Sequence, residues 1–311
     1  MNRLAPTLIL ALICMPVMAW EVGNSGTSVN TDYHEAFSAI TPDGLTLFIS
    51  SDRPGGYGPS ELGVSWGAAS YDIYVTHRET LDSAWGPVVN LGSNINTSAS
   101  EHSPMLSPDG HYLYFMSARP GGFGGGDIYR SYRVDVSDDS AWERPENLGA
   151  GVNGPYADSC PVFYVADDGA AHLFYVQGAG PDTATIDFKV SELNKDTNTF
   201  SDARTVQIST PLLDGHLDPW HGLIWGGQYS GGLGGSDIYN TVRIASEEDL
   251  SKSWTTPINA GPGINTQYDE TMPSAIADGS RLYFNSDRPG GHGGMDIYEA
   301  LSDNLAQTHP E

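Results

Sequence analysis

The sequence predicts an all-β protein, a five-bladed β-propeller that is closed by its own N-terminal strand. Three observations support this prediction. A glycine-rich unit recurs along the chain, and its copies end at Tyr74, Tyr129, Phe188, Tyr239 and Tyr298. Each unit holds short alternating runs between turn residues, which is the pattern of strands joined by tight turns. The tryptophan segment that the last unit lacks stands at the beginning of the chain.

The first 19 residues have the composition of a secretory signal peptide. They hold one basic residue, Arg3, an apolar run from Leu8 to Val17 and a short exit segment before Trp20. Such a segment is too short and stands too early to be a membrane anchor. We therefore expect residues 1–19 to be removed and residues 20–311 to form a single propeller domain, either periplasmic or secreted.

The chain is strongly acidic, with 39 Asp and Glu against 14 Lys and Arg and a formal net charge of −25. A surface of this charge repels nucleic acid and anionic lipid, so both classes of partner are excluded. The same charge is typical of an exported protein that stays soluble, and we expect a monomer with no insertion into a membrane. The 37 glycines gather mainly in the repeated loops, where they serve turns.

The best-preserved unit runs from Ser107 to Tyr129 and reads SPDGHYLYFMSARPGGFGGGDIY. A Pro-Asp-Gly turn leads into an alternating run that ends at Met116, and a glycine-rich loop then leads into a short strand at residues 127–129. Close copies lie in the first and last units, and more divergent copies lie in the third and fourth. The period of about 50 to 60 residues, with several strands in each unit, is typical of a propeller.

In the first, second and fourth units the second half begins with a tryptophan and ends with an acidic residue. It reads WGPVVNLG from Trp85 in the first unit, and a degraded version stands in the third. The last unit has no such segment, but a copy starts at Trp20, ahead of the first unit. We therefore expect residues 20–23 to pair with residues 296–298 and close the ring, because this exchange removes the open sheet edges.

The Pro-Asp-Gly turn, the Ser-Asp-Arg-Pro-Gly-Gly loop and the Gly-Gly-x-Asp-Ile-Tyr strand resemble the TolB-like, WD-repeat-like propeller repeats, especially those beside OmpA-type domains in envelope proteins. The resemblance covers nearly all of the chain after the signal peptide. It implies the propeller fold. For function it implies several roles, namely a protein-interaction scaffold, a wall-associated module or part of an enzyme.

Acidic residues open the innermost strand of each blade. They are Glu35, Glu101, Asp158, Asp214 and Glu270. Because inner strands line the axis of a propeller, we expect these carboxylates to form a ring at one mouth. In blades one, two and five an arginine follows 18 residues later, and these are Arg53, Arg119 and Arg288. Each should form a structural ion pair with the glutamate of its own blade and so tie the loop to the strand.

Blades three and four differ, since they have aspartate in place of glutamate and no arginine in the matching loop. A carboxylate without a cation must find water, backbone donors, a metal or a ligand. We therefore assign a ligand site to Asp158, Asp214, His216, Asp218, Trp220 and His221. Trp220 would stack on a sugar ring, and the acids would accept hydrogen bonds from its hydroxyls. A blade whose sequence had only diverged from the repeat, with a repacked interior and no ligand, would show the same residues.

Other chemical motifs are weak. The run from Gly121 to Asp127 is similar to the calcium-binding glycine nonapeptide, but its copies are a blade apart, so we interpret it as a loop. Calcium at the acidic mouth is left open as a cofactor, and the nine histidines show no zinc spacing. Cys160 has no catalytic signature, and its only possible disulfide partner lies in the signal peptide, so we expect a small buried residue of the inner strand.

Two classes of function fit these observations. The first, which we favour, is an exported propeller that binds a glycan or a cell-envelope protein at the acidic mouth. The alternative is a glycoside hydrolase-like enzyme, because five-bladed glycosidases of the arabinanase type hold carboxylates at the axial mouth. Asp158, Asp214 and Asp218 would then be catalytic. The matched arginines count against the enzyme, since a nearby cation lowers a carboxyl pKa and disfavours proton donation.

Overall fold

The computed structural model describes residues 20–60, 65, 69–166, 168–178, 186–207, 214–218, 222–228, 231–241, 249–252 and 254–302. For residues 214–218, 222, 223 and 225 it describes the backbone alone. Within these ranges the chain forms strands, turns and loops and no helix. None of the described residues therefore belongs to an apolar helix of membrane-spanning length.

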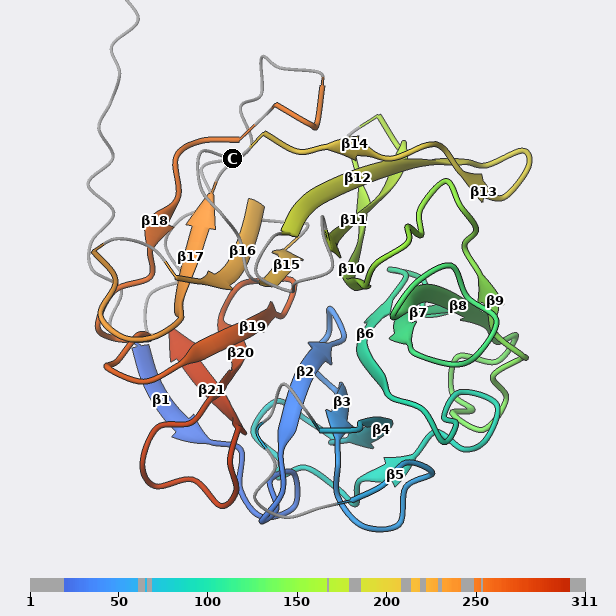
Figure 1. Cartoon of the computed structure of the whole chain (residues 1–311). Helices are drawn as coiled ribbons and strands as arrows, with labels where there is room; N and C mark the ends of the chain where they lie inside the picture. Colours follow the sequence, from blue (N-terminus) through green and yellow to red (C-terminus); the bar gives the residue numbers. More distant parts are fainter. Residues whose placement is uncertain are drawn as a thin grey trace, which may run out of the picture.

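Five antiparallel sheets follow one another around a central axis, and each is one propeller blade (Figure 1). Blade one is β2 (Glu35–Ile40), β3 (Thr46–Ser51), β4 (Asp72–His77) and β5 (Val89–Asn90). Blade two is β6 (Glu101–Leu106), β7 (Tyr112–Ser117), β8 (Asp127–Tyr132) and β9 (Glu146–Asn147). Blade three is β10 (Asp158–Val165), β11 (Ala171–Gly178), β12 (Ile186–Asn194) and β13 (Thr199–Phe200), with β14 (Arg204–Thr205) also on β12. Blade four is β15 (Asp214–Asp218), β16 (Gly222–Gly227), β17 (Asp237–Thr241) and β18 (Ile258–Asn259).

Blade five is built from both ends of the chain. It consists of β19 (Glu270–Ala275), β20 (Arg281–Ser286), β21 (Asp296–Ser302) and the N-terminal strand β1 (Trp20–Asn24). β1 pairs antiparallel with β21 from Trp20 opposite Ser302 to Asn24 opposite Tyr298. The predicted five-bladed propeller and its closure by the N-terminal strand are confirmed. Without β1, the outer edge of β21 would present unpaired backbone groups.

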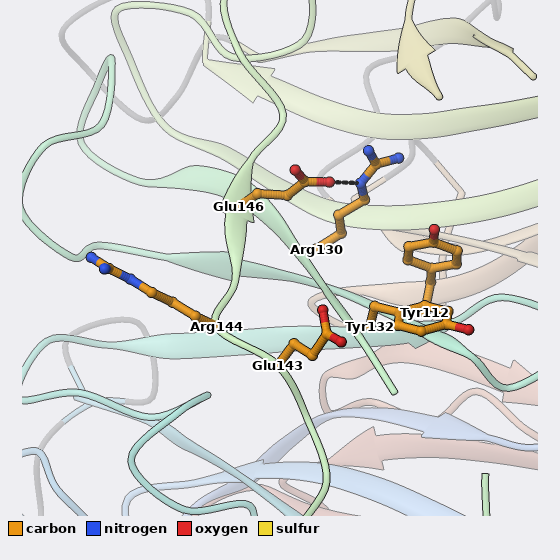
Figure 2. Close-up of a pocket in the computed structure, with 6 residues that line it drawn as sticks. All are labelled: Tyr112, Arg130, Tyr132, Glu143, Arg144 and Glu146. Carbon is orange, nitrogen blue, oxygen red and sulfur yellow. Dashed lines mark hydrogen bonds and ion pairs between the residues drawn. The ribbon is translucent and has the colours of Figure 1, made fainter. Parts of the chain in front are cut away.

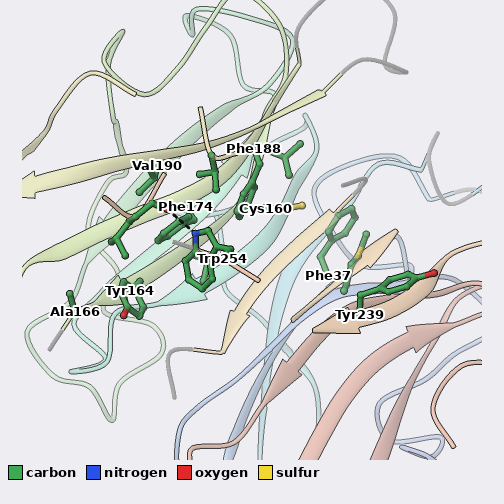
Figure 3. Close-up of a cluster of buried hydrophobic side chains, with 14 of the residues drawn as sticks. Phe37, Cys160, Tyr164, Ala166, Phe174, Phe188, Val190, Tyr239 and Trp254 are labelled. Atoms are coloured by element: carbon green, nitrogen blue, oxygen red, sulfur yellow. Dashed lines mark hydrogen bonds between the residues drawn. The ribbon is translucent and has the colours of Figure 1, made fainter. Parts of the chain in front are cut away.

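Trp85 and Trp254 seal the boundaries between their own blades and the preceding ones. Trp85 precedes the short strand β5 and lies against Tyr283 of blade five, with ring centroids 6.1 Å apart. In blade four, Trp254 packs edge-on against Phe174 of blade three at 5.8 Å, and its indole N–H donates to the carbonyl of Leu250 at 2.7 Å (Figure 3). Burying a large side chain of this kind contributes about 2–3 kcal/mol. These tryptophans thus mark blade boundaries, and the outer strands β5, β9, β13 and β18 of blades one to four are only two residues long.

The glycine-rich loops also join neighbouring blades, through close backbone contact. A Cβ atom at Gly124 in blade two would overlap the carbonyl oxygen of Tyr156, in the loop that enters blade three. In the same way, a Cβ atom at Gly293 would overlap the carbonyl oxygen of Tyr33 at the ring closure. Only glycine allows this approach, which explains why the repeat keeps glycine here.

Candidate functional site

The start of the inner strands and the glycine-rich loops emerge on the same side of the propeller, which we call the mouth face. In blade one, Glu35 of β2 stands opposite Ser51 of β3, and Ser51 stands opposite Asp72 of β4. The same alignment joins Glu101 with Ser117 and Asp127 in blade two, and Glu270 with Ser286 and Asp296 in blade five. The loop that enters β2 and the loop from β3 to β4 therefore lie at one end of the blade.

Glu35 is completely buried in a cage of hydrogen-bond donors. The backbone N–H and the hydroxyl of Thr31 each donate to it at 2.7 Å, and the hydroxyl of Ser51 donates at 2.9 Å. Arg53 completes the cage from the glycine-rich loop, with Nη2 donating at 2.9 Å. This carboxylate holds together the entering loop, two strands and the glycine-rich loop.

The matching pairs in blades two and five are built alike. Nη2 of Arg119 lies 3.6 Å from Glu101, Nη2 of Arg288 lies 3.0 Å from Glu270, and both glutamates are completely buried. Burial raises the pKa of Glu35 and of Glu101 above the ordinary value, by more than the arginines and hydrogen bonds lower it. The expectation that the arginines hold these pKa values down is therefore wrong for these two residues, because the loss of hydration is the larger effect.

Asp158 occupies the same position in blade three, where Gln177 stands at the register position of Ser51 and no arginine is present. The N–H of Gly154 donates to one carboxyl oxygen at 2.6 Å, and Nε2 of Gln177 donates to the other at 2.8 Å. Gln177 stands opposite Asp158 in the register of β10 and β11. The carboxyl is completely buried, and burial raises its pKa to about 6. Asp158 thus has neutral donors within hydrogen-bond distance and keeps its proton at a higher pH than an ordinary aspartate.

The remaining residues of the predicted ligand site belong to blade four. Asp214 begins β15 on the mouth face, and Asp218 ends the strand four residues further on, about 13 Å away at its far end, so the backbone does not bring these two acids together. The side chains of Asp214, His216 and Asp218 are outside what the structure describes. Trp220 and His221 lie outside the described residues altogether. The inner strands β10 and β15 contact each other, so the backbone places Asp158 and Asp214 at neighbouring positions of the mouth face.

No metal centre is formed by the part of the chain that the structure describes, because no three His, Cys, Asp or Glu side chains come together in it. In the loop that is similar to the calcium nonapeptide, Asp127 accepts the N–H groups of Phe123 and Gly124 at 2.6 and 3.0 Å. Its carboxylate holds the loop itself. Calcium therefore stays a prediction that concerns the acids of blade four.

Behind the acids, the axis is filled with side chains. Four inner strands each carry a β-bulge, and in each of them the third residue of the strand has a positive φ. These residues are Phe37, Ser103, Cys160 and Met272. All four are buried, with Sδ of Met272 3.2 Å from the N–H nitrogen of Phe37 and Sγ of Cys160 3.6 Å from Oγ of Ser103. His102 stacks on Phe37 at 4.3 Å, and burial lowers its pKa to about 4. A ligand at this end would therefore lie on the mouth face.

Exposed side chains project from the tips of the glycine-rich loops on this face. They are Tyr57, Phe123, Leu233 and His292, and the first three are 48%, 52% and 48% exposed. The backbone N–H of each tip residue donates, at 2.5–2.6 Å, to the aspartate that opens the third strand of its blade. These aspartates are Asp72, Asp127, Asp237 and Asp296. Each tip is thus presented by a pinned loop.

Sequence reasoning missed both the tips and the aspartates that pin them. The signal was present in the repeat, because glycine surrounds the tip position while the tip residue itself changes among Tyr, Phe, Leu and His. A position that varies in residue type between glycines that do not vary is typical of the protein surface. The aspartate of Asp-Ile-Tyr was interpreted as the beginning of a strand, although an acidic residue there has the reach to cap the preceding loop.

Solved structures with the same propeller fold include carbohydrate-active enzymes. An α-L-arabinofuranosidase from Podospora anserina, in complex with cellotriose, has a TM-score of 0.57 and 11% identity, with 93% of this chain and 98% of that chain covered. A GH43 β-xylosidase/α-arabinofuranosidase from a compost metagenome, in complex with xylotriose, has a TM-score of 0.56 and 14% identity over 91% and 94%. A protein of unknown function from Dyadobacter fermentans has a TM-score of 0.56 and 13% identity over 90% and 98%. No family model and no curated protein matches the sequence.

The fold therefore places the chain among five-bladed propellers of the kind found in glycoside hydrolase families 43 and 62. The resemblance to TolB-like, WD-repeat-like repeats is wrong as a family assignment, although the propeller fold that it implied is correct. Its short motifs serve local needs, since the aspartate pins a loop and the glycines permit close backbone contact. The expected envelope-protein partner has no support from these structures, and the monomeric state stays a prediction.

Proposed function

We propose that the protein is a carbohydrate-active propeller that binds a glycan across its mouth face. The observation that supports this most is the set of loop tips, in which Tyr57 and Phe123 expose about half of their side chains on loops fixed by buried aspartates. Exposed aromatic rings offer a sugar a flat apolar surface to stack on. Because the loops are held in place before binding, little conformational entropy is lost when the ligand arrives.

The kind of glycan follows from charge. The chain carries a net charge of −25, so a polyanionic polysaccharide would be repelled. A neutral glycan would bring hydroxyl groups, which donate well to the carboxylate that we expect in blade four at Asp214, the residue that begins β15 on the mouth face. The solved complexes of similar fold contain cellotriose and xylotriose, which are neutral, and this agrees with the proposal.

Affinity gel electrophoresis tests this proposal, with arabinan, xylan and arabinoxylan cast into separate gels. We expect at least one polysaccharide to retard the protein, and Asp214→Ala to reduce the retardation without lowering the melting temperature. The matched control is Asp196→Asn, an exposed carboxylate in the turn between β12 and β13, at the opposite end of blade three. No retardation in any gel, or equal losses in both variants, would contradict the proposal.

Hydrolysis of the bound glycan is a second candidate function, and the raised pKa of Asp158 favours it. A glycosidase needs one carboxylic acid that is protonated near the working pH and a second carboxylate. Asp158 has a pKa of about 6, and Asp214 begins the neighbouring inner strand on the same face. Complete burial of Asp158 counts against its direct contact with a polymer, so Asp214 is the first residue to test.

Release of reducing sugar from arabinan and arabinoxylan distinguishes the enzyme from the binder. If the protein is an enzyme that acts at the mouth face, we expect Asp214→Asn to lower the rate about a hundredfold or more, as removal of an acid or base does. Asp196→Asn should leave the rate unchanged. Retardation in gels without any release of sugar would leave the binding function and reject the catalytic one.

A further inference from the structure

Blade two carries a pocket that lies away from the mouth face (Figure 2). Its volume is about 260 Å³, and it is lined by Tyr112, Arg130, Tyr132, Glu143, Arg144 and Glu146. Tyr112 and Tyr132 stand opposite each other at the far ends of β7 and β8, five residues from the Ser117 and Asp127 pair that marks the mouth. At about 3.3 Å per residue, the pocket lies roughly 17 Å from the mouth face.

Two aromatic rings form one wall of this pocket. The rings of Tyr112 and Tyr132 are 5.1 Å apart at an angle of 56°, and His111 stacks on Tyr132 at 5.8 Å. The hydroxyl of Tyr112 accepts a hydrogen bond at 3.3 Å from the side chain of Asn198, in the hairpin turn of blade three. The wall therefore belongs to blade two, and blade three holds it through Asn198.

Charged groups form the rest of the lining, and their signs balance. Arg130 is nearly buried and makes an ion pair with Glu146, and it also donates to the carbonyl of Asn198 at 2.7 Å. Figure 2 shows the two tyrosines on one side of Arg130 and the carboxylate of Glu146 on the other. Glu143 and Arg144 are exposed. The pocket thus offers fixed donors and acceptors next to apolar rings, with no net charge of its own.

The propeller does not require this combination. At the positions that correspond to Tyr112 and Tyr132, blade one has Thr46 opposite His77, and blade five has Arg281 opposite Leu301. The aromatic wall therefore belongs to blade two and is not part of the repeat. Blade three has His172 opposite Glu192 at this position. Among the blades for which the structure describes both residues of this pair, blade two alone has two aromatic rings, and we attribute this pair to a ligand.

We propose that this pocket is a second carbohydrate-binding site that takes one neutral sugar ring of a glycan. The tyrosine wall would stack on the ring, Glu143 and Glu146 would accept its hydroxyl hydrogens, and Arg130 would hold Glu146 in place. The volume is slightly below the range of about 300–1,000 Å³ typical of small-molecule pockets, which fits a single ring. The site is independent of the mouth face and would let the protein hold one polymer, or two chains, at separate points.

Amide NMR spectra recorded during addition of xylotriose test this site separately from the mouth. We expect the amides of residues 111–114 and 130–133 to shift. Tyr132→Ala should raise the dissociation constant read from these shifts about tenfold, which corresponds to about 1.4 kcal/mol. Glu143→Gln, a change at an exposed side chain that leaves the fold intact, should also weaken binding. Phe123→Ala, at the mouth face, is the matched control and should leave these shifts unchanged.

The proposal is overturned if the pocket amides do not respond to xylotriose, or if Tyr132→Ala and Glu143→Gln both bind as the unmodified protein does. It is also overturned if trigalacturonic acid, an acidic probe, binds there more tightly than xylotriose. A response at residues 119–126 alone would support the function proposed for the mouth face and reject the pocket. A response at the pocket alone would support the site in blade two and contradict the function proposed for the mouth face.

Discussion

Removing Arg119 tests whether the matched ion pairs belong to the scaffold. Its Nη2 donates to the carbonyl of Ile95 at 2.6 Å and lies 3.6 Å from Glu101, and its Nε donates to the hydroxyl of Ser117 at 2.7 Å. Arg119→Ala would delete these contacts and leave a buried carboxyl without its cation. We expect the free energy of unfolding to fall by about 1–3 kcal/mol. This is less than for a fully buried pair, because the side chain of Arg119 is 15% exposed.

The loss should also depend on pH. Burial raises the pKa of Glu101 above its ordinary 4.5, so the folded protein binds more protons there than the unfolded chain does. Stability from this group therefore falls as the pH rises from 4.5 through the folded-state pKa. Without Arg119 the folded-state pKa rises further, so the deficit of Arg119→Ala should be largest at neutral pH and shrink as the pH approaches 4.5.

Urea unfolding at pH 7 and pH 5 measures both effects. The control is Arg204→Ala, which breaks the exposed pair between Arg204 and Asp249 at 2.9 Å and should cost at most about 0.5 kcal/mol. The reasoning is refuted if Arg119→Ala loses no more stability than Arg204→Ala, or if its loss is the same at both pH values.

Three further predictions concern the scaffold and the acids. Deleting residues 20–31 removes β1 and should expose the edge of β21, so we expect aggregation by light scattering, and a soluble monomer would contradict this. Asp158→Asn should abolish a pH dependence of roughly 3 kcal/mol between pH 4 and pH 7, because the folded pKa is about 6 against an ordinary 3.8 and stability falls as the pH rises between them. If the urea unfolding midpoints of the unmodified protein and of Asp158→Asn change with pH in the same way, that estimate is wrong. If blade four binds calcium, millimolar calcium should raise the melting temperature above that measured in chelator. An unchanged melting curve would contradict calcium binding.

The fold could be predicted because each unit of the sequence repeat encodes one blade. The closing strand was visible since one segment was missing from the last unit and present before the first, and β1 does pair with β21. Burial, in contrast, depends on neighbouring blades. The glutamates at the mouth were expected to be ion pairs with lowered pKa values, but their cages exclude water, and burial raises the pKa of Glu35 and Glu101.

The candidate site was predicted less completely. Asp158 was expected to need a ligand because its loop has no arginine, yet Gln177, on the adjacent strand, supplies a neutral donor. A cross-strand partner is set by register, which the sequence does not show directly. The tyrosine wall of the pocket in blade two was missed for the same reason, because Tyr112 and Tyr132 meet only through strand pairing.

The central claim is that a glycan is held across the mouth face by the loop tips. It is tested most directly by calorimetric titration of the double variant Tyr57→Ala, Phe123→Ala with the polysaccharide that retards the protein most. We expect the affinity to fall about tenfold or more, at an unchanged melting temperature, because both side chains are exposed and only their backbone is pinned. Ile258→Ala, an exposed apolar residue of the outer strand β18, should bind normally. Unchanged affinity in the double variant would contradict the claim.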